Sequence, residues 1–135
     1  MNEYRQNLLK EIGINDLETV LSSADWYRIS KKGNLSEDFM REFKEEIYWG
    51  VVYVKQILSD DFLIELQDTI NWTFYFMSIK CSYPIMKKFI TKAELFYFRQ
   101  FELSHFNEQQ INELQRIIDL KYIFQKDKIK LEKTI

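Results

Sequence analysis

Apolar residues recur every four positions in two consecutive segments of the chain, a spacing that places side chains on one face of an α-helix. The two series are Phe39, Phe43 and Ile47, and then Phe62, Leu66 and Ile70. Ser36 and Ser59 precede these series, and each serine is followed by two acidic residues. A serine at this place accepts hydrogen bonds from the free amides of a helix start, and carboxylates suit the positive end of the helix dipole. The pattern therefore predicts a helix that begins after each serine.

The two segments belong to a longer internal repeat. Tryptophans mark it at Trp26, Trp49 and Trp72, and the serine of the helix start recurs with the same spacing at positions 36, 59 and 82. A period of about 23 residues is typical of repeat proteins, in which similar units stack on one another. A residue with the same place in every unit usually packs against its neighbours, so we expect the tryptophans to lie in the core.

Weaker copies flank the three complete units. With two residues inserted, a fourth unit places Tyr97 at the tryptophan position and Asn107 at the helix start, followed by the apolar residues Leu114 and Ile118. A partial unit precedes the first one: Tyr4, Leu17 and Val20 align with Tyr27, Met40 and Phe43.

The repeat predicts the domain organisation. We expect one helical-repeat domain over residues 1–120 and a basic C-terminal cap or tail over residues 121–135. The units of this domain lie near 25–47, 48–70, 71–93 and 96–118, with the partial unit before residue 25. The tail is compatible with a cap on the stack, a paired strand or a segment that stays flexible until a partner binds.

The first half of each unit is compatible with two structures. Asp25 and Asn71 stand where the cap of a short helix is expected, and Gly33 is a natural helix end. Residues 48–54 and 72–76, by contrast, are rich in the β-branched and aromatic residues typical of strands. The favoured fold is all-α, a short α-solenoid of stacked helical hairpins. The alternative is an α/β strand-helix repeat with a small parallel sheet.

Residues 26–47, with Leu-Ser-Glu-Asp-Phe at 35–39 and then Phe43, together with their copy at 49–70, resemble a known short repeat. That repeat occurs in uncharacterised proteins of large DNA viruses, bacteriophages and some bacteria. The third unit departs from the pattern at three positions: Cys81, Tyr83 and Pro84. The resemblance implies a repeat scaffold and brings with it no activity, cofactor or site residue.

Composition agrees with a helical chain. Three glycines and one proline in 135 residues are too few for the many tight turns of a β-sandwich or barrel. The same shortage excludes a glycine-rich phosphate-binding loop, because no two glycines are close enough to cradle a phosphate. The chain also has eleven Phe, eight Tyr and three Trp, several at recurring positions, which predicts an aromatic core.

The residue types that carry catalysis or bind metals are scarce. His105 and Cys81 are the only histidine and cysteine, so these types cannot form a metal site and offer a single nucleophile–base pair. Cys81 occupies the apolar position before a predicted helix start, which is typical of a buried and inert thiol. The acid pair Asp60 and Asp61 is explained by its place at a helix start. We expect no catalysis, no metal and no cofactor.

The chain start and the apolar runs indicate a cellular location. The first residues form no apolar leader, and the apolar run at 48–54 is far below the roughly 20 residues of a membrane span. A single cysteine cannot form an internal disulfide, which is typical of a reducing compartment. We expect a cytoplasmic protein that does not engage a membrane, and the sequence leaves its oligomeric state open.

Charge is unevenly distributed, although the net charge is only −2. Residues 1–70 carry eight Lys/Arg and fourteen Asp/Glu, and residues 71–135 carry eleven and seven, so the two halves have net charges of −6 and +4. The candidate binding residues lie in the basic half: Lys87, Lys88, Lys92 and Arg99. These side chains suit phosphates or acidic groups, although a solvated helix face has the same composition.

These observations favour a non-catalytic protein–protein interaction module whose partner is another protein. The likeness to viral and phage proteins points, by analogy, to an adaptor or inhibitor of a host protein. The alternative is a nucleic-acid-binding accessory protein that uses the basic region at residues 80–133.

Overall fold

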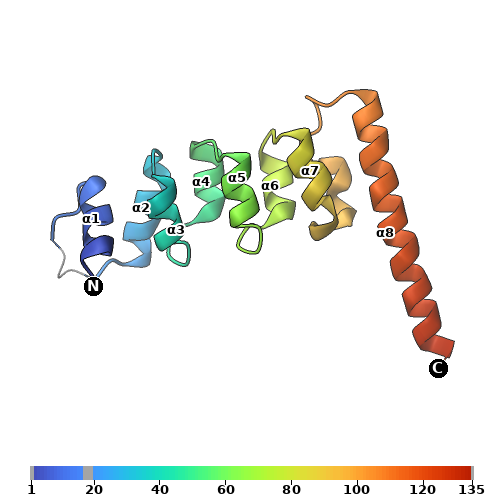
Figure 1. The fold of residues 1–135 in the computed structure, drawn as a ribbon, viewed down its shortest axis with the longest axis horizontal. Coiled ribbons are helices and arrows are strands. Elements are labelled where there is room, and N and C mark those ends of the chain that lie inside the picture. Colours follow the sequence, from blue (N-terminus) through green and yellow to red (C-terminus); the bar gives the residue numbers. More distant parts are fainter. Residues whose placement is uncertain (1, 17–19, 135) are drawn as a thin grey trace. The chain divides into compact units, whose positions relative to one another are not determined.

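The computed structural model describes residues 2–16 and 20–134, with side chains as far as Lys128. Every regular element in these residues is helical (Figure 1), so the all-α prediction is confirmed and the strand-helix alternative is wrong. Leu17, one of the residues of the predicted partial unit, lies outside the described residues.

The chain forms two compact units, Met1–Ile70 and Asn71–Ile135. The division falls between the second and third repeats, where the net charge also changes from −6 to +4. The domain boundary that we expected at residue 120 lies inside helix α8 (Glu108–Thr134), so the predicted tail begins as a continuation of this helix.

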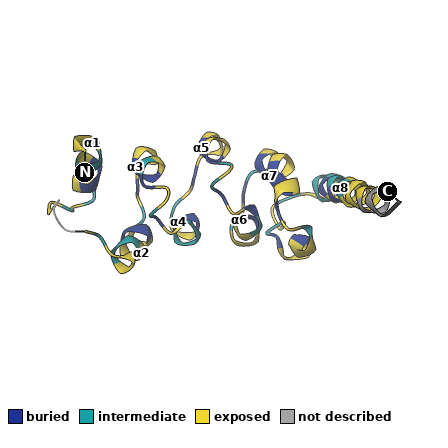
Figure 2. Ribbon diagram, turned by 90° about the horizontal axis from the view of Figure 1, so that it is seen from below, coloured by how far each residue is buried: buried dark blue, intermediate teal, exposed yellow. Residues whose placement is uncertain are grey.

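The first unit consists of short helices in two rows (Figure 2). One row contains α1 (Glu3–Glu11), α3 (Glu37–Glu42) and α5 (Asp60–Glu65), and the other contains α2 (Ser23–Lys32) and α4 (Trp49–Lys55). Helix α1 packs against α3, and α2 packs against α4. Within this unit, each complete repeat contributes one helix to each row.

Serines cap three of these helices, and at α3 and α5 they are the serines that the sequence predicts. Ser36 Oγ accepts a hydrogen bond from the amide of Phe39 at 3.0 Å, and Ser59 makes the equivalent bond at the start of α5. Helix α2 differs from the prediction, because its cap is Ser22 and not Asp25. The Asp25 carboxylate instead accepts a hydrogen bond from the amide of Ser22, and the two residues form a reciprocal capping box.

The second helix of each repeat ends earlier than its apolar spacing predicts. Helices α3 and α5 are only six residues long, and the chain continues from each into turns. Ile47 lies in the turn after α3, yet it is buried and its amide still donates to the carbonyl of Phe43 at 3.1 Å. The buried face therefore continues past the end of the helix.

A single side chain holds the connection between α2 and α3. Gly33 ends α2 with a φ of 77°, a left-handed conformation that favours glycine. Gln56, which follows α4, accepts a hydrogen bond from Leu35 N at 3.0 Å and donates one to Leu35 O at 3.1 Å. Both backbone polar groups of Leu35 are thereby satisfied by the following repeat.

The second unit begins with the same pattern and then departs from it. Its elements are, in order, α6 (Trp72–Ser78), α7 (Tyr83–Phe89), the 3-10 helices η1 (Ile90–Lys92) and η2 (Leu95–Gln100), and α8. Asn71 and Ser82 cap α6 and α7, and Asn107 accepts a hydrogen bond from the first turn of α8, as predicted. Leu114 and Ile118 of α8 are buried, whereas no described side chain after Ile118 is.

Each tryptophan packs on the second helix of its own repeat. The ring centres are 5.1 Å apart for Trp26 and Phe43, 6.5 Å for Trp49 and Phe62, and 4.2 Å for Trp72 and Phe89. The predicted core position is confirmed for Trp72, whereas Trp26 and Trp49 are half-buried. These ring contacts are made within a repeat and not between neighbouring repeats.

Both flanking copies contain a wrong prediction. Tyr97 is exposed while its neighbour Phe98 is buried, because η2 turns every three residues and so rotates the tryptophan position away from the core. Val20 is 91% exposed, unlike Phe43 with which it aligns. Helix α1 lies in the row of α3 and α5, so the N-terminal segment supplies the second helix of a repeat and not the first.

Candidate interaction surfaces

The structure divides the predicted basic residues among three elements. Lys87 Nζ on α7 lies 2.5 Å from Glu113 Oε1 on α8. The ammonium groups of Lys88 and Lys92 lie 6.0 and 5.7 Å from the centre of the Phe89 ring. Arg99 is exposed on η2. Two of the four predicted residues therefore flank one aromatic ring, and a third is committed to an ion pair within the unit.

The ion pair of Lys87 belongs to a small network between α7 and α8. Lys87, together with the Tyr83 hydroxyl, holds the pKa of the Glu113 carboxyl below its usual value. Burial and the neighbouring Glu113 carboxylate raise the pKa of Tyr83 to about 12. These groups support one another across two helices, so Lys87 has a structural role.

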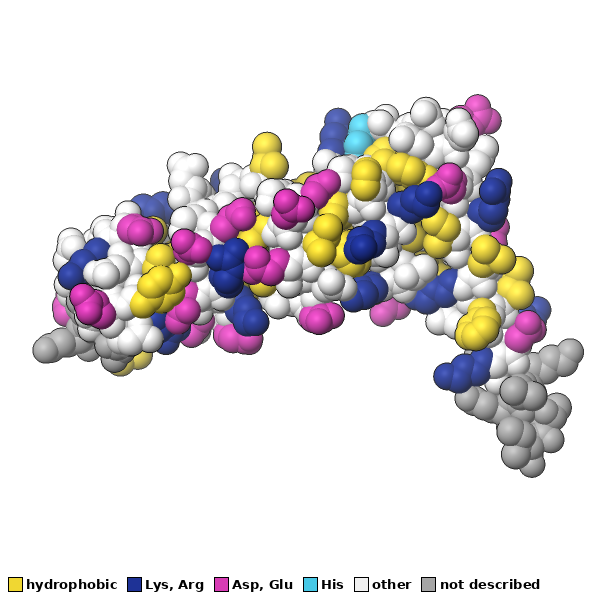
Figure 3. Space-filling view, viewed as in Figure 1, with side chains coloured by type: hydrophobic (Ala, Val, Ile, Leu, Met, Phe, Trp, Pro, Cys, Tyr) yellow, Lys and Arg dark blue, Asp and Glu magenta, His cyan; other side chains and the backbone are white. Residues whose placement is uncertain are grey.

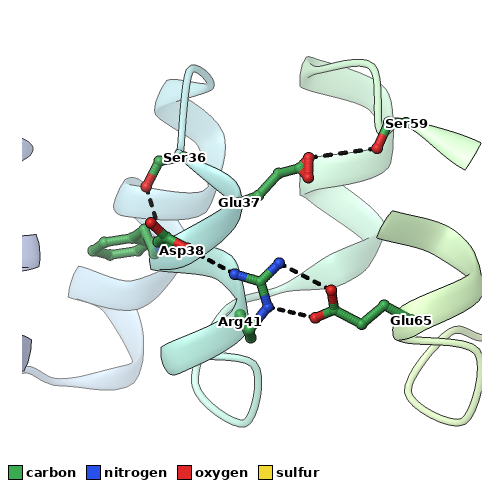
Figure 4. A network of polar contacts seen from close by, with 7 residues as sticks. Ser36, Glu37, Asp38, Arg41, Ser59 and Glu65 are labelled. Carbon is green, nitrogen blue, oxygen red and sulfur yellow. Dashed lines mark hydrogen bonds and ion pairs between the residues drawn. The ribbon is translucent and has the colours of Figure 1, made fainter. Parts of the chain in front are cut away.

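The first unit contains an equivalent ion pair (Figure 4). The guanidinium of Arg41 on α3 binds both carboxylate oxygens of Glu65 on α5, one of them at 3.0 Å, and also contacts Asp38 at 2.7 Å. Arg41 lowers the pKa of Glu65. Glu37 accepts a hydrogen bond from Ser59 at 3.4 Å, which adds a second polar contact between the two repeats.

The repeat register explains why the two ion pairs resemble each other. Lys87 lies two repeats after Arg41, and each of them binds an acidic residue on the corresponding helix of the next repeat. Once the two inserted residues of the fourth unit are allowed for, Glu65 and Glu113 occupy the same repeat position. Helix α1 is joined to α3 in a similar way, since Arg5 contacts Glu42 at 3.1 Å and Glu46 at 3.2 Å. A comparison of charges in the repeat register would have identified Lys87 as a structural residue.

The largest concentration of one charge lies on α3, α5 and the turns that follow them, residues 36–47 and 59–70, which we call the acidic face. It contains nine Asp/Glu and two Lys/Arg, a net charge of −7. Seven of the acidic residues are exposed: Glu37, Asp38, Glu45, Asp60, Asp61, Glu65 and Asp68. Figure 3 shows acidic side chains gathered over this part of the first unit.

A hollow of about 490 Å³ borders the acidic face. Leu21, Trp26 and Ile47 contribute apolar walls, and Glu45 and Glu46 contribute carboxylates. Polar atoms make up more of its lining than apolar atoms do. The hollow suits a positively charged side chain whose aliphatic stem packs on the apolar wall.

His105 contacts the backbone of Cys81. His105 Nε2 lies 2.6 Å from the backbone carbonyl oxygen of Cys81, and the cysteine is buried, as its place in the repeat predicts. Among the described residues, no cluster of three or more His, Cys, Asp and Glu is arranged to hold a metal ion. None of the helices in this part of the chain combines the length and apolarity needed to cross a bilayer.

Sequence reasoning also missed the outward side of α8. Leu120, Ile123 and Phe124 are exposed on this helix, in a region expected only as a basic tail. Their spacing of three and four residues is the signal that was available, since it places them near one another on a helix.

Comparison of the chain with protein-family models, curated proteins and solved structures finds no match. The likeness to a viral and phage repeat therefore stays a prediction, and the surfaces described above carry the functional argument.

Proposed function

We propose that the chain is a non-catalytic protein–protein interaction module, a short α-solenoid whose partner binds the acidic face. The observation that carries this proposal is the concentration of exposed carboxylates at recurring positions of α3, α5 and their turns. Charged surfaces of this kind steer complementary partners and select among them. The two rows of helices in the first unit, and the polar contacts from one repeat to the next, support the solenoid.

The chemistry of the face defines the partner. Nine acidic residues against two basic ones favour a segment rich in Lys or Arg. The neighbouring hollow, with Trp26, Glu45 and Glu46 in its wall, favours a Lys or Arg of that segment, whose stem packs on the ring while its charge meets the carboxylates.

The experiment is a capture from cell lysate on the immobilised full chain at low salt. Glu45→Lys reverses one charge beside the hollow, and we expect it to reduce the amount of captured partner by about tenfold. Glu94→Lys makes the same charge change on an exposed residue of the second unit and serves as the matched control. If both variants capture the same proteins in the same amounts as the unchanged chain, the acidic face is not the binding surface.

The nucleic-acid alternative has less support, because Glu113 already neutralises Lys87. Fluorescence anisotropy with short DNA and RNA probes at low salt separates the two proposals. Binding that falls steeply with salt, and is lost in a Lys88→Glu/Lys92→Glu variant, would favour nucleic acid.

A further inference from the structure

Helix α8 carries a second apolar site on the side opposite to its buried face. Leu114 and Ile118 face the second unit and are buried, whereas Leu120 and Ile123 are 63% and 54% exposed. An α-helix turns about 100° per residue, so Leu120 and Ile123 project roughly opposite to the buried pair. Two large aliphatic side chains therefore lie in solvent on the outer side of the helix.

Charged residues bracket this apolar pair at regular spacing. Arg116, Leu120, Ile123 and Asp127 are separated by four, three and four positions, and all four side chains are exposed. This is the spacing of a coiled-coil seam, in which one line of side chains faces a partner helix. We call these four residues the outer seam.

The order of the charges selects the partner and its direction. If a second α8 runs antiparallel to the first, Leu120 lies opposite Ile123 of the other copy, and Arg116 lies opposite Asp127 at both ends. In a parallel pair, Arg116 would face Arg116 and Asp127 would face Asp127, which is repulsive. The seam is thus complementary to itself in one direction only.

We propose that two copies of the chain associate through the outer seams of α8 in an antiparallel, two-fold symmetric pair. A two-fold interface uses the same residues on both copies, and it is the commonest symmetry of soluble oligomers. Phe124 lies beside the seam and is 74% exposed, so it adds apolar area to the contact. The proposal does not depend on the acidic face, which lies on other helices.

The length of the seam sets the strength of the pair. It covers about three helical turns, which is less surface than a permanent dimer buries. We therefore expect monomers at low micromolar concentration and dimers at submillimolar concentration, in rapid exchange.

Sedimentation velocity of the full chain across this concentration range tests the pairing. Leu120→Glu places two carboxylates at the centre of the interface, and we expect it to abolish the dimer. Tyr122→Glu is the matched control, since Tyr122 is equally exposed and lies on the same turn but outside the seam. Circular dichroism of each variant verifies that the helices are retained.

A charge exchange tests the direction. Arg116→Asp turns both end contacts from attraction to repulsion and should raise the dimer dissociation constant about tenfold. Asp127→Arg alone should do the same, and the double variant Arg116→Asp/Asp127→Arg should restore the original value. A parallel pair would show no such rescue, because each single variant would only exchange one like-charged contact for another.

Three results would overturn the proposal. The first is a chain that remains monomeric at every concentration, and the second is a dimer equally insensitive to Leu120→Glu and Tyr122→Glu. The third is a monomeric chain whose Leu120→Glu variant loses a protein captured from lysate, which would assign the seam to a foreign partner. Because Glu45→Lys leaves the seam intact, failure of the pairing and failure of the proposed function are separate outcomes.

Discussion

The two units share the start of a helix at the same repeat position and differ in the net charge of their residues. Ser59 and Ser82 cap their helices in the same way, one in each unit. On the outside, the repeat position that Glu65 occupies in α5 is occupied by Lys88 in α7. Helix starts are thus retained where they determine the fold, while this exposed position changes sign between the units.

The tryptophans show a second difference between the units. Trp72 is 3% exposed and stacks on Phe89 with an angle of 12° between the rings, whereas Trp26 and Trp49 are half-buried and tilted against their partners. Trp49 also donates a hydrogen bond to the carbonyl of Lys44 at 3.0 Å. One repeat position therefore serves as a core residue in the second unit and as a partly exposed residue in the first.

Among the substitutions that test this comparison, the largest loss of stability is expected at Trp72. Trp72→Ala should lower the free energy of unfolding by about 3–5 kcal/mol, because it removes a fully packed aromatic ring. Trp49→Ala should cost less, since its ring is partly exposed already. Urea denaturation of both variants measures the difference, and equal losses would mean that the two sites are packed alike.

The caps should give a smaller effect that is equal in the two units. Ser59→Ala and Ser82→Ala each remove the hydrogen bond of a helix start, and each should cost ~1 kcal/mol. Thermal unfolding compares them with Ser78→Ala, a control at an exposed serine at the end of α6. A cap that costs no more than the control would contradict the shared role of this position.

Removing an ion pair should cause the smallest loss of stability, and this loss should depend on pH. The pKa of Glu113 is lowered from its ordinary value of 4.5, so its contribution to stability is present above pH 4.5 and is lost as the pH falls below it. Glu113→Gln should therefore lower the Tm at pH 7, by less than a lost cap, and its difference from the unchanged chain should shrink as the pH falls through the lowered pKa of Glu113.

Glu65→Gln provides the matching measurement in the first unit. Arg41 lowers the pKa of Glu65, so the sign of the pH dependence is the same as for Glu113. A Tm difference that stays the same as the pH falls from 7 into the acid range, in either variant, would show that the amide disturbs packing instead of removing an ion pair.

Local signals account for the parts of the fold that the sequence predicts correctly. A cap such as Ser36 bonds to an amide only three positions away, so it can be recognised from a short stretch of sequence. The four-residue spacing of apolar residues is also local, because it places them on one face of a single helix. The prediction that Tyr97 takes the packed tryptophan position was wrong, because the change from α-helix to 3-10 helix comes from tertiary packing. The length of α8 was missed for a related reason, since its outer side has no partner within the unit.

The candidate surfaces were predicted less well than the fold. Lys87 was identified as a binding residue because it is basic, but its partner Glu113 lies on the following long helix, more than a full repeat further along the chain. The acidic face arises when α3 and α5 come together in one row, which the spacing of charges within either helix does not indicate. Surfaces of this kind depend on the register between repeats, so they are found by comparing charges at matching repeat positions and not from either helix alone.

The contacts between repeats also affect how the chain folds during its synthesis. Leu35 is bonded by Gln56, Arg41 binds Glu65, and Lys87 binds Glu113, so each of these partners lies close to one repeat further along the chain. Contacts over such short separations need only small loops to close, and proteins rich in them fold quickly. During synthesis, a repeat that has left the ribosome finds its next partner in the repeat that follows it. The chain is therefore suited to fold progressively from its N-terminus. At each stage, only a short stretch of apolar surface is exposed until the next repeat packs against it.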